Sequence, residues 1–206
     1  MRARWTAAAT LSTYATVRMG QGVTTGGAVR HVAVVGLMGS GKTTVGARLA
    51  ALLGWPLRDS DAAIESSQGR TVRELRDELG VDAMHALEAR QLLDALAEPG
   101  PSVICPAASV ADVEICLVAL AAPDVFVVFL TATPAVAAGR FQSSQHRPWY
   151  GDDPAAFLAQ QALVRYPRLR ALDPLEIATD DRTPDAIVGL VVAALAARGV
   201  AVPPGA

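Results

Sequence analysis

Short apolar runs alternate along the chain with longer stretches in which apolar residues recur every three or four positions. Runs rich in valine, isoleucine and phenylalanine between turn-forming residues are typical of buried strands, and the wider spacing is typical of helices with one buried face. The runs predict strands in residues 31–35, 55–61, 101–106, 125–130 and 175–179. The spacing predicts helices in residues 42–53, 71–79, 83–97, 111–122, 133–141, 154–172 and 184–198.

Strands and helices therefore alternate, which indicates an α/β layered domain with a parallel sheet. We expect one such domain in residues 29–200, without internal repeats. Residues 1–28 contain no acidic residue and lack the apolar stretch of a secretory signal, so we expect a disordered N-terminal extension. Residues 201–206 are expected to form a loose tail.

Composition narrows the classes of partner. The chain has 206 residues, 51% of them hydrophobic and 18% charged, which suits one globular domain with a full core. A net charge of −2 argues against nucleic acid as a partner, and the longest apolar run, residues 186–197, is too short to span a membrane. Cys105 and Cys116 have no metal-ligand spacing and form no disulfide framework. We therefore expect a cytoplasmic monomer.

One segment carries a specific motif. The sequence GLMGSGKTT, Gly36–Thr44, fits G-x-x-x-x-G-K-[ST] and lies between a predicted strand and a predicted helix. Its glycines allow backbone N–H groups to point at phosphate oxygens, and the start of the helix favours the same negative charge. Lys42, the only lysine in the sequence, is expected at the β- and γ-phosphates, and the Thr43 hydroxyl at Mg²⁺. The motif predicts binding of ATP or GTP.

Two carboxylates end the second predicted strand. Asp59 and Asp61 are two positions apart, so they share one face of an extended chain. The carboxyl ends of strands in an open α/β sheet face the ligand crevice. One carboxylate can therefore serve the metal, and the other can take the proton of an acceptor hydroxyl. The alternative is that Asp61 only caps the helix that follows.

A polar loop, residues 142–154, separates two predicted helices and contains Arg147. Polar loops of this length are often lids that close over a bound ligand. An arginine on a lid can stabilise the charge of a phosphoryl group in transfer. The alternative is an arginine that only faces solvent.

Together these segments resemble the shikimate kinases, small P-loop kinases that phosphorylate the 3-hydroxyl of shikimate with MgATP. The resemblance covers about residues 30–199 and implies a three-layer fold with a parallel sheet flanked by helices. It implies that Thr43 and Asp59 hold Mg²⁺, and that Asp61 contacts the acceptor as the catalytic base. The segment LVRYPRL is similar to the family's helix that supplies a carboxylate-binding arginine, here Arg165. The nucleotide-binding residues are then Gly36, Met38, Gly39, Ser40, Gly41, Lys42, Thr43, Thr44, Arg140, Arg147 and Pro184, with Lys42, Asp61 and Arg147 catalytic.

The acceptor side departs from the family's pattern. The family has a Phe-Arg pair where this chain has Met84-His85, and a run of three glycines where it has residues 107–109. Side chains in place of glycines should crowd an acceptor, and histidine is a shorter, mostly neutral replacement for a guanidinium. The expected acceptor-binding residues are Asp61, Arg76, His85, Ala107, Ala108, Ser109 and Arg165.

Three functions remain open from the sequence. The first is ATP-dependent phosphorylation of shikimate or a shikimate-like small molecule, and the second is phosphorylation of another small polyol or cyclitol. The third is a nucleotide-binding protein with weak or no kinase activity. In the first two, the partner is a small-molecule acceptor and the cofactors are ATP and Mg²⁺.

Overall fold

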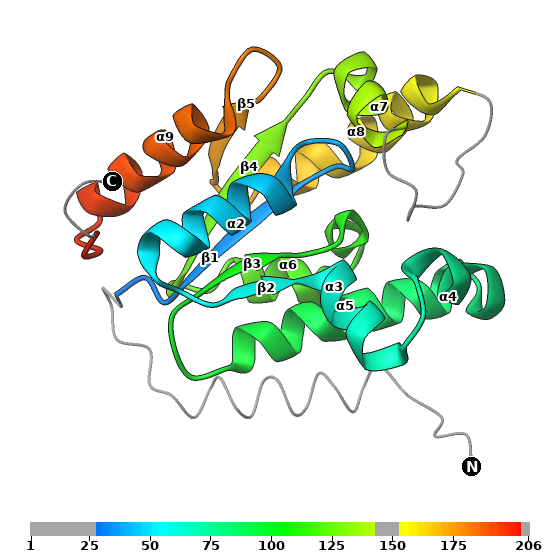
Figure 1. The fold of residues 1–206 in the computed structure, drawn as a ribbon, viewed down its shortest axis with the longest axis horizontal. Coiled ribbons are helices and arrows are strands. Elements are labelled where there is room, and N and C mark those ends of the chain that lie inside the picture. Colours follow the sequence, from blue (N-terminus) through cyan, green and yellow to red (C-terminus); the bar gives the residue numbers. More distant parts are fainter. Residues whose placement is uncertain (1–27, 143–152, 203–206) are drawn as a thin grey trace.

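The computed structural model describes residues 28–142 and 153–202. At its centre is a parallel sheet with the strand order β2-β3-β1-β4-β5 (Figure 1). Every residue of β1 is buried, as expected for a central strand of a parallel sheet that is covered on both faces. The strands are β1 (His31–Gly36), β2 (Leu57–Asp59), β3 (Ser102–Cys105), β4 (Val125–Thr131) and β5 (Leu175–Ala178).

Helices cover both faces of this sheet, which gives a three-layer α/β fold and confirms the predicted fold class (Figure 1). Val32 and Val34 of β1 pack against α2 and α9, whereas Ala33 and Val35 pack against α5, α6 and α8. The alternating side chains of one strand therefore build both core layers. The helices are α2 (Lys42–Leu53), α3 (Ser60–Gln68), α4 (Val72–Leu79), α5 (Val81–Ala97), η1 (Ala108–Asp112), α6 (Glu114–Leu120), α7 (Pro134–Gln142), α8 (Pro154–Arg170) and α9 (Pro184–Ala197).

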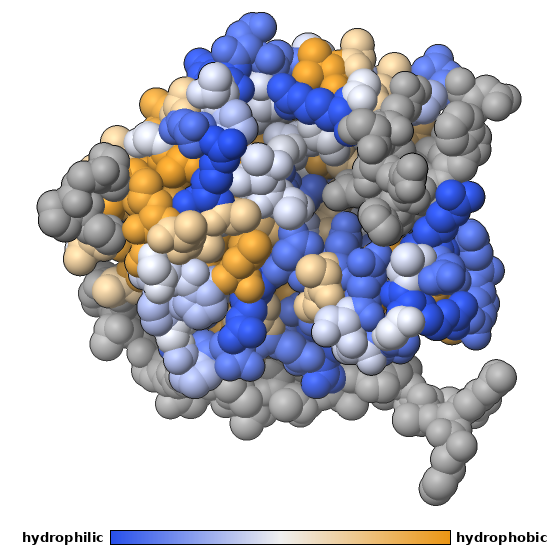
Figure 2. Space-filling model, in the orientation of Figure 1, coloured by the Kyte–Doolittle hydropathy of each residue, from blue (hydrophilic) through white to orange (hydrophobic). Residues whose placement is uncertain are grey.

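A smaller apolar cluster lies beside the sheet. Ile64 of α3, Val72 and Leu75 of α4, and Met84 of α5 are buried against one another. The other end of α5 packs against the sheet through Leu92 and Leu96, so α5 joins the small cluster to the main core. On the face seen in Figure 2, polar residues cover the region of α4, while apolar residues gather beside α2 and α9.

One predicted helix is divided in the structure, and one helix of the structure was not predicted. The predicted helix in residues 111–122 is divided into η1 and α6, because Val113 between them has an extended backbone (φ −109°, ψ 112°). Helix α3 was not predicted as an element, because its nine residues carry few apolar side chains.

The structure does not support the alternative in which Asp61 only caps α3. The side chain that caps it belongs to Asp59, which accepts a hydrogen bond from the Ala62 N–H at 3.3 Å. Asp61 lies inside the first turn of the helix, so capping does not explain its presence.

The predicted extension and tail lie largely outside the described residues, because residues 1–27 and 203–206 are not described. Both therefore stay predictions. Within the two described ranges, no helix combines the length and the apolar character that crossing a bilayer requires.

Candidate active site

The phosphate loop follows β1 and ends at the first turn of α2. Gly39 and Gly41 have φ angles of 75° and 93°, which side-chain-bearing residues rarely adopt. A Cβ atom on Gly39 would lie 2.2 Å from the carbonyl oxygen of Ala137, so the loop also needs glycine here to fit against α7. Gly41 precedes α2 without a side-chain cap, so the first N–H groups of the helix remain available to an anion.

Lys42 and Thr43 start α2 and connect the loop to the end of β2. The Lys42 ammonium donates hydrogen bonds to the carbonyl oxygens of Gly36 at 3.0 Å and Leu37 at 3.1 Å. The Thr43 hydroxyl donates to Asp59 Oδ2 at 2.8 Å. A hydroxyl beside a carboxylate supplies the hard oxygen ligands that Mg²⁺ prefers, and bound phosphates and waters usually complete its coordination. These two residues therefore fit the predicted metal position.

The remaining predicted loop residues differ in their exposure. Met38 lines the adjoining cavity, and the Ser40 hydroxyl is buried without a hydrogen-bond partner among the described residues. Thr44, in contrast, is exposed in the first turn of α2.

Arg140 lies on α7, toward the β5–α9 connection. Its guanidinium donates to the hydroxyl and to the carbonyl oxygen of Thr179, both at 2.9 Å. Thr179 directly follows β5, and the same connection leads to Pro184 at the start of α9. The structure therefore ties Arg140 to the segment that contains the predicted Pro184 contact. Arg147 lies outside the described residues, so its role stays a prediction.

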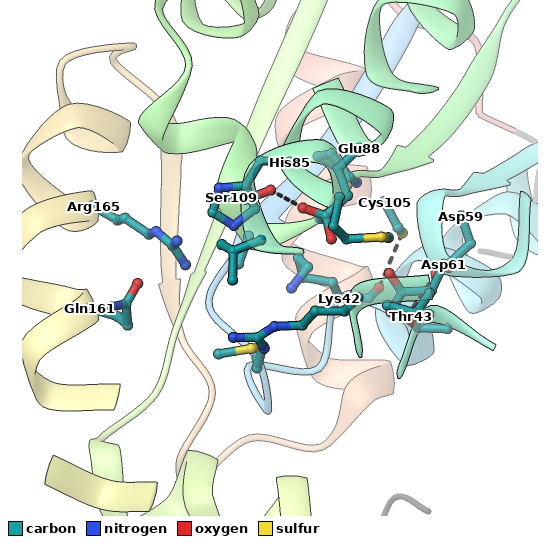
Figure 3. A pocket seen from close by; sticks show the side chains of 18 of the residues that line it. Lys42, Thr43, Asp59, Asp61, His85, Glu88, Cys105, Ser109, Gln161 and Arg165 are labelled. Carbon is teal, nitrogen blue, oxygen red and sulfur yellow. Dashed lines mark hydrogen bonds between the residues drawn. The ribbon is translucent and has the colours of Figure 1, made fainter. Parts of the chain in front are cut away.

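One cavity of about 220 Å³ joins the phosphate loop to the expected acceptor residues (Figure 3). Lys42, Thr43 and Asp61 line it on the side of α2 and α3. Gln161 and Arg165 of α8 face them across the space in Figure 3. The other expected acceptor residues also line this cavity: Arg76, His85, Ala107, Ala108 and Ser109.

Arg165 is in the cavity wall but already has a carboxylate partner. Its Nε donates to both carboxylate oxygens of Asp112, at 3.1 and 3.0 Å, and its Nη2 donates to Asp112 Oδ2 at 2.6 Å. Only 9% of the Arg165 side chain is exposed, against 32% for Asp112. Asp112 was not among the residues expected from the sequence, because the ion pair depends on how α8 packs against η1.

His85 is half-buried beside this ion pair. Burial lowers the pKa of His85, the charge of Arg165 lowers it further, and Asp112 partly opposes the effect. The imidazole is therefore neutral near pH 7. It offers hydrogen bonds to an acceptor but not the fixed positive charge of an arginine.

Glu88 is a buried carboxyl group on the same helix as His85. Ser109 donates a hydrogen bond to it, so the serine at the end of the altered glycine run turns toward α5 (Figure 3). Burial raises the pKa of Glu88 to about 7, although the bond from Ser109 acts in the opposite direction. This pairing could not be predicted from the sequence, because the two residues are 21 positions apart.

The raised pKa of Glu88 predicts a pH-dependent stability. An ordinary glutamate has a pKa near 4.5, so between pH 4.5 and 7 the folded chain holds a proton that the unfolded chain releases. The free energy of unfolding therefore falls as the pH rises through this window. Glu88→Gln removes this loss. The unfolding free energy of the variant relative to that of wild type should therefore increase by up to about 3 kcal/mol from pH 5 to pH 8. Urea unfolding of both proteins at pH 5 and pH 8 measures this increase. If the two proteins differ in unfolding free energy by the same amount at both pH values, the prediction is contradicted.

Comparisons with known proteins agree with this geometry. A family model described as shikimate kinase matches residues 38–196. The shikimate kinase of Thermobifida fusca (strain YX) is 35% identical over 166 residues, which cover 81% of this chain and 95% of the relative. The shikimate kinase of Caulobacter vibrioides (strain NA1000 / CB15N) is 37% identical over 139 residues, which cover 67% of this chain and 68% of the relative.

The fold also matches solved structures. Shikimate kinase from Acinetobacter baumannii in complex with shikimate has a TM-score of 0.77 at 23% identity, with 84% of this chain and 96% of that chain covered. A gluconokinase from Sinorhizobium meliloti 1021 is more distant, with a TM-score of 0.53 at 23% identity and 82% of this chain covered. The chain belongs to the shikimate kinase family and is a small-molecule kinase that uses ATP and Mg²⁺.

Proposed function

We propose that this enzyme transfers the γ-phosphoryl group of ATP to a hydroxyl of shikimate or a shikimate-like small molecule. The observation that carries the proposal is the single cavity in which Lys42, Thr43 and Asp61 lie opposite the acceptor-side residues of α5 and α8. A reacting hydroxyl in this cavity has a carboxylate on one side and the phosphate loop on the other. The relatives that are shikimate kinases, and the shared fold, support the same reaction.

The cavity residues take complementary roles in this proposal. The carboxylate of Asp61 accepts the proton of the acceptor hydroxyl as that oxygen forms a bond to the γ-phosphorus. The bond between the γ-phosphorus and the bridging oxygen breaks, and ADP leaves. The Lys42 ammonium, now 3.0 Å from the Gly36 carbonyl oxygen, supplies positive charge to the phosphates.

The other sequence-predicted residues complete the proposal. Thr43 and Asp59 hold Mg²⁺, whose charge neutralises phosphate oxygens when it is bound. Backbone N–H groups of residues 36–44 surround the phosphates, and Arg140 and Pro184 flank the adenine. Arg147 is proposed to contact the phosphates as the family resemblance implies.

A coupled assay of ADP release tests the function. With MgATP present, shikimate should stimulate ADP release, and mass spectrometry should find one added phosphoryl group on the acceptor. The 3-deoxy analogue of shikimate should not stimulate release, because the hydroxyl that is phosphorylated in the family is absent from it. The proposal fails if the folded protein binds ATP but no hydroxyl-bearing acceptor, cyclitols included, stimulates release. That result would favour a nucleotide-binding protein without kinase activity.

A further inference from the structure

Arg165 makes its strongest hydrogen bonds through one edge of the guanidinium. Nε and Nη2 form that edge, and both donate to the carboxylate of Asp112. Two parallel N–H groups of this kind are the usual receptor for a ligand carboxylate. The Arg165 side chain as a whole is 9% exposed, so its contact with a ligand is limited to the part that lines the cavity. An internal carboxylate therefore occupies the edge of the guanidinium that would bind an acceptor carboxylate through Nε and Nη2.

Displacing Asp112 gives a carboxylate-bearing acceptor little advantage. The acceptor would replace one charged pair by another, and Asp112 would lose its partner while staying near the incoming negative charge. Like charges at short range repel, and a partly buried carboxylate without its partner is unfavourable. An acceptor that bears only hydroxyl groups avoids both effects, because the Arg165–Asp112 pair stays intact.

The neighbouring groups are suited to hydroxyls. Gln161 lies one turn before Arg165 on α8, and its amide both donates and accepts hydrogen bonds. His85 contributes a neutral ring, and Ser109 lies beside Glu88. Of the remaining cations, Arg76 shares the cavity with the carboxylates Asp59 and Asp61, and Lys42 belongs to the phosphate loop. The acceptor region therefore contains carboxylates as well as cations before a ligand enters.

We propose that this cavity favours polyhydroxylated acceptors without a carboxylate over acceptors that carry one, and that Asp112 sets this preference by occupying Arg165. The proposal rests on the proposed kinase function and specifies its acceptor class. Shikimate then remains a substrate of the reaction, but with weak binding of its carboxylate.

Shikimate and its primary carboxamide form a matched pair of acceptors, because they have the same ring hydroxyls and differ in charge. For the wild-type enzyme, kcat/KM for the carboxamide should equal or exceed kcat/KM for shikimate. Asp112→Asn removes the competing charge and should raise kcat/KM for shikimate on the order of 10-fold, the lower range expected for one charged hydrogen bond. The value for the carboxamide should change less than about 3-fold, and the KM for ATP should stay the same.

Glu114→Gln is the matched control. Glu114 begins α6 and accepts a hydrogen bond from Arg168 of α8 at 3.0 Å, so it also joins α8 to this part of the fold. Its removal should leave the ratio of the two kcat/KM values unchanged. Asp112→Ser repeats the test with a smaller uncharged side chain and should change the ratio in the same direction as Asp112→Asn. Thermal melts establish that each variant is folded.

Two results would overturn the proposal. One is a wild-type preference for shikimate over the carboxamide of about 10-fold or more, the size of one charged hydrogen bond. The other is a folded Asp112→Asn protein whose preference is unchanged. If neither these two acceptors nor any cyclitol stimulates ADP release, the proposed function fails instead. Calorimetric binding of both compounds to wild type and to Asp112→Asn then still decides whether Asp112 disfavours the carboxylate.

Discussion

Replacing Asp61 by asparagine is expected to lower kcat by about 10²- to 10⁴-fold, the usual range for loss of a general base. Asparagine keeps the shape of the side chain but cannot take a proton from the acceptor hydroxyl. Asp61 lies in the first turn of α3 and lines the cavity together with Lys42, so the affected step is phosphoryl transfer. The KM for ATP should change little, because the phosphate loop is not altered. Steady-state rates with the acceptor varied at saturating MgATP measure the effect.

Asp59→Asn separates this role from metal binding. Asp59 accepts the hydrogen bond from the Thr43 hydroxyl at 2.8 Å, so its loss should raise the Mg²⁺ concentration that half-saturates the rate. Asp61→Asn should leave that concentration nearly unchanged. A folded Asp61→Asn enzyme with a rate close to that of wild type would show that Asp61 is not the base. Glu88, which also lines the acceptor side of the cavity, would then be the next candidate for the catalytic base.

Replacing Lys42 by methionine is expected to lower kcat by about 10²- to 10³-fold, as loss of one group that stabilises transition-state charge typically does. Methionine preserves much of the length of the side chain but brings no charge to the phosphates. It also loses the hydrogen bonds to the Gly36 and Leu37 carbonyl oxygens, so a thermal melt must accompany the rates. Single-turnover measurements with saturating ATP separate slower transfer from weaker binding.

The sequence offers an independent check, because Lys42 is its only lysine. An acylphosphate derivative of ATP should label wild type at Lys42, apart from the N-terminal amine, and excess ATP should protect it. The methionine variant should lose this label. Labelling of Lys42 that excess ATP does not reduce would contradict its placement at the phosphates.

Most of the layered fold followed from the sequence, since buried strands and amphipathic helices leave regular patterns. The predictions of helices were wrong where the local pattern of apolar residues is weak. Helix α3 has few apolar residues because only one side of it meets the small cluster with α4. The apolar spacing of residues 111–122 predicts one helix, although an extended Val113 divides it. Such a change in backbone direction depends on tertiary packing. The spacing of apolar residues in the sequence does not reveal that packing.

The site also contains residues that a local motif predicts and residues that only tertiary packing brings together. The phosphate loop could be located because its chemistry is contained in consecutive residues, Gly36–Thr44. The partner of Arg165 could not be located, because Asp112 lies 53 positions away and reaches it only through the packing of α8. The pairing of Glu88 with Ser109 is equally non-local. Motifs therefore indicated the nucleotide side, whereas the charge balance of the acceptor side required the structure.

The small apolar cluster of α3, α4 and α5 bears on how this enzyme can diverge. Ile64, Val72 and Leu75 pack with Met84, whereas Leu37 of the phosphate loop packs with Ala137 and Ala138 of α7 in another cluster. Substitutions that do not share contacts usually have additive effects on stability. Residues 62–87 can therefore be exchanged among relatives as a unit that brings new acceptor contacts, such as Arg76 and His85, with their own packing, while Asp61 stays in place. Changes of acceptor contacts in this cluster can therefore leave the packing of the phosphate loop intact.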